Sequence, residues 1–218
     1  MSRKKKPSGR QPLFNRGKSW ESYQRRQNII TPRKTILIVC EGEQTEPNYF
    51  TALRNTLRKK NIRVVVVPGG ERLVTPLYLV QNLEAEIRNL DWDPAQDEAW
   101  CVFDVDQANT QIALQRAIDL AKKHHYRLAL SNPAFEYWIL LHYERTGRAF
   151  INSSEVIRVL NHYIPDYSKS MAVFPLIFGF TSYAIENAEA LRANHEARWE
   201  DFPNPSTSVD ALVKNLWE

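Results

Sequence analysis

The sequence contains few of the residues and runs that define several common classes of protein. It has two cysteines in 218 residues. Cys40 and Cys101 lie in apolar segments without CxxC or Cys/His spacing, which argues against a disulfide framework or a zinc ribbon. No apolar run approaches the ~20 residues of a membrane-spanning helix, and the N-terminus lacks the apolar core of a secretory signal. We therefore expect a cytoplasmic protein with no membrane contact, in which both cysteines are small core residues.

Several catalytic signatures are missing as well. The chain has only 7 glycines, and it contains no glycine-rich phosphate loop, no dinucleotide-binding fingerprint and no Gly-x-Ser-x-Gly elbow. Any ATP hydrolysis would have to come from a partner. The length fits one domain, or one domain with an appended part.

The net charge of +4 is the sum of a strongly basic N-terminal segment and an acidic remainder. Residues 1–34 contain eleven Lys or Arg and one acid, whereas the remainder contains 18 basic and 24 acidic residues. Cations neutralise phosphates and aromatic faces stack on bases, so this basic arm with interleaved aromatics favours nucleic-acid binding, and a solvated, flexible tail is the alternative. The predicted contacts are Arg3, Lys4, Lys5, Lys6, Arg10, Arg16, Lys18, Arg25 and Arg26.

Strand-like and helix-like segments alternate after the arm. Each of four short apolar runs is followed by a segment with helical periodicity, which predicts an α/β fold with a parallel sheet flanked by helices. The runs of strand length are 35–40, 63–67, 100–105 and 127–130. The fourth helix is expected to start at Asn132-Pro133 and to run to about Tyr143.

The pattern changes after residue 147. Helical periodicity near 154–162, 181–199 and 208–216 predicts a mainly helical C-terminal extension packed on the core. The expected organisation is a flexible basic arm at 1–34, an α/β core at 35–146 and the extension at 147–218.

Acidic residues directly follow two of the apolar runs. Glu41 and Glu46 come after the first run, and Asp104 and Asp106 end the third. Ligands bind at the carboxyl ends of parallel strands, and the side chains of residues i and i+2 in a strand share a face. Asp104 and Asp106 can thus aim two carboxylates at one Mg²⁺, an ion that prefers hard oxygen ligands. Helix capping and solvent exposure are the alternatives for such acids.

Three longer motifs are similar to those of the RloB family. They are CEGEQTEPNYF at 40–50, SNPAFEYWILLH at 131–142 and NPST at 204–207. Glu41 followed by the later Asp104-Val105-Asp106 also resembles the Toprim signature of topoisomerases, primases and OLD-type nucleases. The likeness covers about residues 35–214 and excludes the basic arm.

The resemblance implies a Toprim-like sheet, a role in bacterial anti-phage defence, and an ATPase partner encoded nearby. It implies that Glu41 acts as general acid/base and a metal ligand, and that Asp104 and Asp106 hold Mg²⁺, with Mn²⁺ as an alternative ion. Glu46, Glu136 and His142 match family motif positions and complete the catalytic candidates, without an assigned role.

Structural alternatives stay open for Glu46 and His142. Glu46 precedes a proline and can serve helix capping, and His142 shares a helix face with apolar residues, as a core histidine does. The first hypothesis is a Mg²⁺-dependent DNA or RNA nuclease, and the alternative is a non-catalytic nucleic-acid-binding or sensor subunit of a defence complex. A third hypothesis is phosphoryl chemistry on nucleotides. The sequence leaves open DNA or RNA as substrate, one metal or two, activation by a partner, and the oligomeric state.

Overall fold

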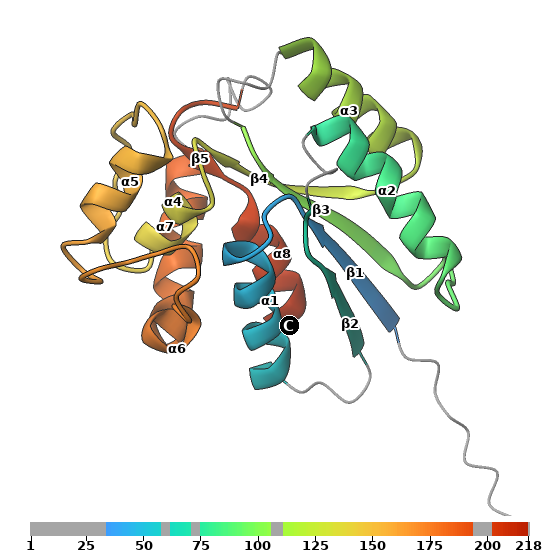
Figure 1. The fold of residues 1–218 in the computed structure, drawn as a ribbon, viewed down its shortest axis with the longest axis horizontal. Coiled ribbons are helices and arrows are strands. Elements are labelled where there is room, and N and C mark those ends of the chain that lie inside the picture. Colours follow the sequence, from blue (N-terminus) through green and yellow to red (C-terminus); the bar gives the residue numbers. More distant parts are fainter. Residues whose placement is uncertain (1–33, 58–61, 71–74, 106–110, 194–201, 218) are drawn as a thin grey trace, which may run out of the picture. The chain divides into compact units, whose positions relative to one another are not determined.

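The computed structural model describes residues 34–57, 62–70, 75–105, 111–193 and 202–217 (Figure 1). Its strands are β1 (Lys34–Cys40), β2 (Ile62–Val67), β3 (Glu98–Asp104), β4 (Arg127–Asn132) and β5 (Ser206–Thr207). Its first four helices are α1 (Thr45–Leu57), α2 (Pro76–Arg88), α3 (Gln111–Lys123) and α4 (Glu136–Leu140). The later ones are α5 (Ser153–Leu160), α6 (Phe174–Ile177), the 3₁₀ helix η2 (Phe178–Phe180), α7 (Thr181–Ala193) and α8 (Val209–Trp217).

The strands form one sheet in the order β2-β1-β3-β4-β5. The first four strands are parallel, and β5 pairs antiparallel with β4 at the edge. β1 and β3 occupy central positions because their runs of apolar residues can be covered on both faces. The carboxyl ends of the parallel strands therefore lie at one edge of the sheet, where the acidic residues follow.

Alternate residues of the strands face two separate apolar clusters. Ile36 and Ile38 of β1 join α1, α4, α8 and other helices of the extension, whereas Leu37 and Val39 join α2 and α3. Figure 1 shows α2 and α3 on one face of the sheet and α1 and α8 on the other. The expected fold class, a mostly parallel α/β sheet flanked by helices with a helical C-terminal part, is confirmed.

Two local expectations differ from the structure near β4. The strand continues to Asn132, and α4 begins only at Glu136, not at Pro133. The edge strand β5 was not expected, because two residues are too few to show an alternating pattern. Its pairing of Ser131 with Thr207 joins positions far apart in the chain.

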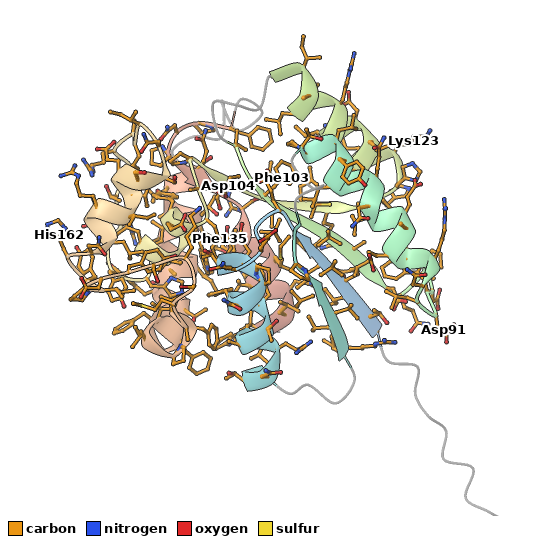
Figure 2. All side chains as sticks on the ribbon, viewed as in Figure 1. Asp91, Phe103, Asp104, Lys123, Phe135 and His162 are labelled. Atoms are coloured by element: carbon orange, nitrogen blue, oxygen red, sulfur yellow. The ribbon has the colours of Figure 1, made fainter. Side chains whose placement is uncertain are left out.

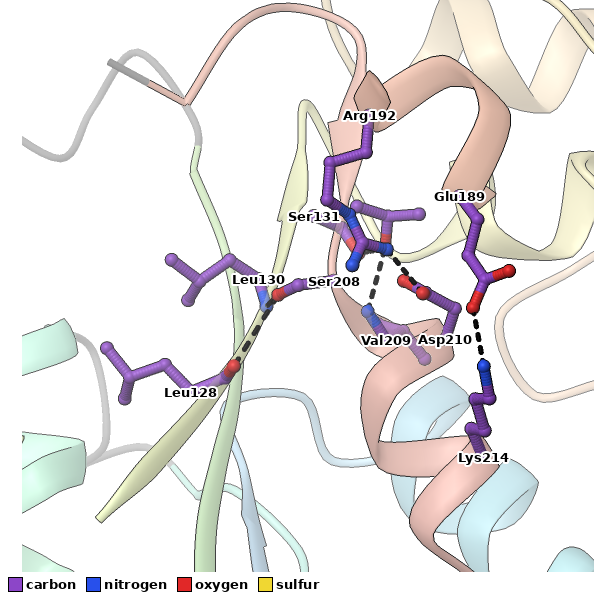
Figure 3. A network of polar contacts seen from close by, with 10 residues as sticks. Leu128, Leu130, Ser131, Glu189, Arg192, Ser208, Val209, Asp210 and Lys214 are labelled. Atoms are coloured by element: carbon purple, nitrogen blue, oxygen red, sulfur yellow. Dashed lines mark hydrogen bonds and ion pairs between the residues drawn. The ribbon is translucent and has the colours of Figure 1, made fainter. Parts of the chain in front are cut away.

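Polar contacts fasten the C-terminal residues to the core and to α7 (Figure 3). The Ser208 hydroxyl accepts a hydrogen bond from the Leu130 amide at 2.9 Å, and the Ser208 amide donates to the Leu130 carbonyl at 2.8 Å. Between the helices, Arg192 pairs with Asp210. Lys214 also lies 2.8 Å from the Glu189 carboxylate. The extension thus shares one apolar cluster with the α/β core, while the predicted boundary at residue 147 stays a prediction.

Other expectations from composition can be compared with the described residues. Cys40 and Cys101 are free and buried, as expected for core residues. None of the helices in the described ranges combines the length and the hydropathy that a membrane-spanning segment needs. The nine predicted nucleic-acid contacts of the basic arm lie outside the described residues.

Candidate active site

The carboxyl ends of β1 and β3 bring two predicted site residues together. The two strands are parallel neighbours, so the chain leaves both at the same edge of the sheet. The Glu41 amide donates to the Val102 carbonyl at 2.8 Å, which extends the ladder by one residue. The Glu41 carboxylate accepts a hydrogen bond from the Asp104 amide at 3.0 Å. Glu41 and Asp104 are therefore held side by side, with Asp104 next to Phe103 at the end of β3 (Figure 2).

Two glycines allow the backbone to pass close to these acids. A Cβ on Gly42 would lie 2.2 Å from a carboxylate oxygen of Glu46, and a Cβ on Gly69 would lie 1.7 Å from the carbonyl oxygen of Glu41. The Gly69 amide also donates to the Gly42 carbonyl at 2.9 Å. The loop after β2 is thus packed against the loop after β1, at distances that only glycine permits.

Glu46 belongs to the first turn of α1 and is buried, with 6% of its surface exposed. It joins Glu41 and Asp104 around a pocket of about 410 Å³. That volume is in the range of small-molecule sites in proteins. The pocket is lined by Glu41, Gly42, Glu43, Gln44, Thr45, Glu46, Asp104 and Lys169.

Burial and repulsion from nearby carboxylates make Glu46 and Asp104 harder to ionise. The pKa of Glu46 is raised from 4.5 to about 7, mainly by burial and also by the charges of Glu136 and Glu41, against the opposing effects of a backbone hydrogen bond and the charge of Lys169. The pKa of Asp104 lies well above its usual value because its carboxyl group is shielded from water and because the charges of Glu46 and Glu136 are near. The residue as a whole is partly exposed. A bound cation would relieve this repulsion.

Glu136 lies at the start of α4, and 1% of its surface is exposed. It does not line the pocket, but its charge acts on both Glu46 and Asp104. One carboxylate oxygen accepts a hydrogen bond from the Tyr167 hydroxyl at 3.3 Å, and the other has no hydrogen-bond partner among the described residues. A buried carboxylate with an unused oxygen is unusual in a protein interior, and the catalytic role of Glu136 stays a prediction.

Lys169 is a site residue that the sequence analysis missed. It lies in the loop between α5 and α6, lines the acidic pocket, and places its ammonium nitrogen 4.0 Å from Oε1 of Glu136. No local pattern marks a lone lysine in a loop as a site residue. Only the packing of the extension on the core brings it to the acids.

His142 lies apart from the pocket lining. It is 1% exposed, its Nδ1 lies 3.0 Å from the Trp138 carbonyl oxygen, and its ring packs edge-on against Trp138 at a centroid distance of 4.9 Å. Burial lowers the pKa of His142 from 6.5 to about 4. The ring is buried like that of a core histidine, but its Nε2 has no hydrogen-bond partner among the described residues, and its catalytic role stays a prediction.

The donor atoms present at the pocket suit Mg²⁺, which prefers carboxylate oxygens and keeps several waters. Two predicted ligands, Glu41 and Asp104, line one pocket, whereas the third, Asp106, lies outside the described residues. In the part of the chain that the structure describes, no three His, Cys, Asp or Glu side chains form a group able to hold an ion. The two placed ligands thus fit the ion in chemistry, and Asp106 as the third ligand stays a prediction.

A comparison with protein families gives one decisive result. The model of the RloB-like protein family matches residues 36–216. The chain belongs to this family. The match covers most of the chain, including the acids after β1 and β3, α4 and the extension as far as Leu216, and it begins after the basic arm. Curated proteins gave no significant match.

Proposed function

We propose that this RloB-like protein is a Mg²⁺-dependent phosphodiester hydrolase that cuts DNA or RNA in bacterial anti-phage defence. The observation that carries the proposal is the pocket at the carboxyl ends of β1 and β3, where Glu41, Glu46 and Asp104 converge. Such strand ends are where α/β proteins bind their ligands. The defence role and an ATPase partner rest on the resemblance to the family alone.

Four carboxylates have separate roles in this proposal. Glu41 and Asp104, with Asp106, would hold the ion, which supplies positive charge to the phosphate and a means of activating water. Glu46, which is buried at the same pocket, would take a proton from the reacting water as general base. Burial of Glu46 and Glu136 keeps both carboxyl groups in fixed positions.

The test compares nucleic-acid cleavage by the purified full chain and by an Asp104→Asn variant. Mixed DNA and total RNA are incubated with Mg²⁺, with Mn²⁺ and with EDTA. Asn keeps the shape of the side chain and removes its charge, so we expect cleavage to fall by at least about 100-fold, the scale of a lost catalytic group. Glu43→Gln is the matched control, because it removes one charge from an exposed position of the same pocket.

The outcomes separate the hypotheses. Metal-dependent cleavage that is lost in Asp104→Asn and kept in Glu43→Gln supports the hydrolase and identifies its polymer. Cleavage that is equal in all three proteins contradicts the proposed site. Nucleic-acid binding without cleavage under any metal favours the binding or sensor subunit, and hydrolysis of free nucleotides alone favours the third hypothesis.

A further inference from the structure

Lys169 brings a positive charge into a pocket that otherwise presents carboxylates. Among the eight residues that line the pocket, Lys169 supplies the basic side chain, and the acidic ones are Glu41, Glu43, Glu46 and Asp104. A phosphodiester that enters this pocket is repelled by each ionised carboxylate. A cation placed at the rim offsets that repulsion and can donate a hydrogen bond to a phosphate oxygen.

The backbone of Lys169 is fastened to the site. Its carbonyl oxygen accepts a hydrogen bond from the Thr45 hydroxyl at 3.2 Å, and Thr45 is the buried first residue of α1, next to Glu46. Two residues earlier, the Tyr167 amide donates to the side chain of Asn161 at 3.0 Å. The Tyr167 hydroxyl reaches Glu136 at 3.3 Å. The loop is thus held at the site by the backbone of Lys169 and by Tyr167, two residues before it.

The side chain of Lys169, in contrast, remains accessible. It is 58% exposed, and its nitrogen lies 4.0 Å from Glu136, beyond the length of a normal hydrogen bond. An exposed ion pair of this kind contributes little to stability because water screens it. A fixed backbone with an accessible ammonium group suits a residue that binds a ligand, more than one that braces the fold.

We infer that Lys169 binds a non-bridging oxygen of the substrate phosphodiester, so that the C-terminal extension supplies a substrate-contacting residue to the acidic site of the α/β core. The inference rests on the proposed function and deepens it. It assigns the positive side of the site to the loop between α5 and α6. It also gives the extension a direct part in substrate binding.

The first readout is cleavage by Lys169→Met and Lys169→Arg variants. Methionine keeps most of the side-chain length and removes the charge, so kcat/KM should fall by about 10- to 100-fold, the scale of one charge-assisted hydrogen bond. Arginine keeps the charge and should recover part of the loss. Lys214→Met is the matched control, because Lys214 is similarly exposed, pairs with Glu189 and lies away from the pocket.

The second readout does not depend on cleavage. The affinity of the full-length protein for a short labelled single-stranded RNA and its DNA equivalent is measured with Ca²⁺ at several salt concentrations. One lost phosphate contact makes the slope of log affinity against log salt less steep by about 0.7 for a single strand. We expect that change for Lys169→Met and an unchanged slope for Lys214→Met.

The results separate this inference from the hydrolase proposal. A reduced slope without cleavage by any protein leaves the Lys169 contact in place and contradicts the hydrolase. Equal slopes and equal cleavage for wild type and Lys169→Met overturn the inference, as does a wild-type chain that binds neither strand. Loss of activity that only follows a fall in melting temperature, with no recovery by arginine, assigns Lys169 a structural role and also overturns it.

Discussion

Replacing Glu46 with glutamine should stabilise the metal-free protein above neutral pH and have little effect in acid. Glu46 is buried, and its pKa is raised from 4.5 to about 7 by burial and by the charges of Glu136 and Glu41. The folded state therefore holds a proton on Glu46 more tightly than the unfolded state does. Its contribution to stability is complete below pH 4.5 and is lost as the pH rises through 7.

The size of the effect follows from the change in pKa. A rise from 4.5 to about 7, at about 1.4 kcal/mol per pH unit, corresponds to about 3 kcal/mol of stability lost at high pH. Glutamine cannot ionise, so the variant avoids this loss. We expect it to be more stable than wild type by up to about 3 kcal/mol at about pH 8. At about pH 4 the difference should nearly vanish.

The assay is chemical denaturation of wild type and Glu46→Gln in EDTA at each pH. The measured quantity is the difference between their unfolding midpoints. Glu43→Gln is the matched control, because Glu43 lies in the same loop and is exposed, so the change in its stability should be small at both pH values. A stability difference between wild type and Glu46→Gln that does not change with pH would refute the reasoning. So would an equal gain for the exposed control, since burial would then not be the cause.

Two further predictions concern stability. The pKa of His142 is lowered from 6.5 to about 4, so the unfolded state takes up the proton first and the fold should lose stability as the pH falls through this window. The free energy of unfolding should fall by up to about 3 kcal/mol. Chemical denaturation of a His142→Gln variant should show a smaller loss of stability in acid. A pH response equal to that of wild type would contradict this. Gly69→Ala should lower the free energy of unfolding by about 1–3 kcal/mol, because its Cβ would lie 1.7 Å from the Glu41 carbonyl oxygen. Gly70→Ala should have little effect on stability, because its Cβ would have nothing within 4 Å. Equal melting temperatures for the two alanine variants would show that the loop after β2 relaxes freely.

Local patterns in the sequence were enough to predict the α/β core and half of the acidic site. The apolar runs at 35–40 and 100–105 have the length and composition of strands buried on both faces, and acids follow each directly. Parallel strands end at one edge of a sheet, so Glu41 and Asp104 were expected to meet there, as they do. The strands and the Glu41–Asp104 pair could be predicted because a buried strand is recognised from the apolar pattern of a few consecutive residues.

The tertiary structure alone decided the other half of the site. Lys169 and Tyr167 reach the acids only because the extension packs against α1 and α4, and contacts between residues so far apart in the chain leave no local pattern. The same holds for the edge pairing of β5. The burial of Glu136 and the separation of His142 from the pocket depend on what covers α4. Local periodicity determines which residues form strands and helices, whereas packing between distant segments determines which charges face one another.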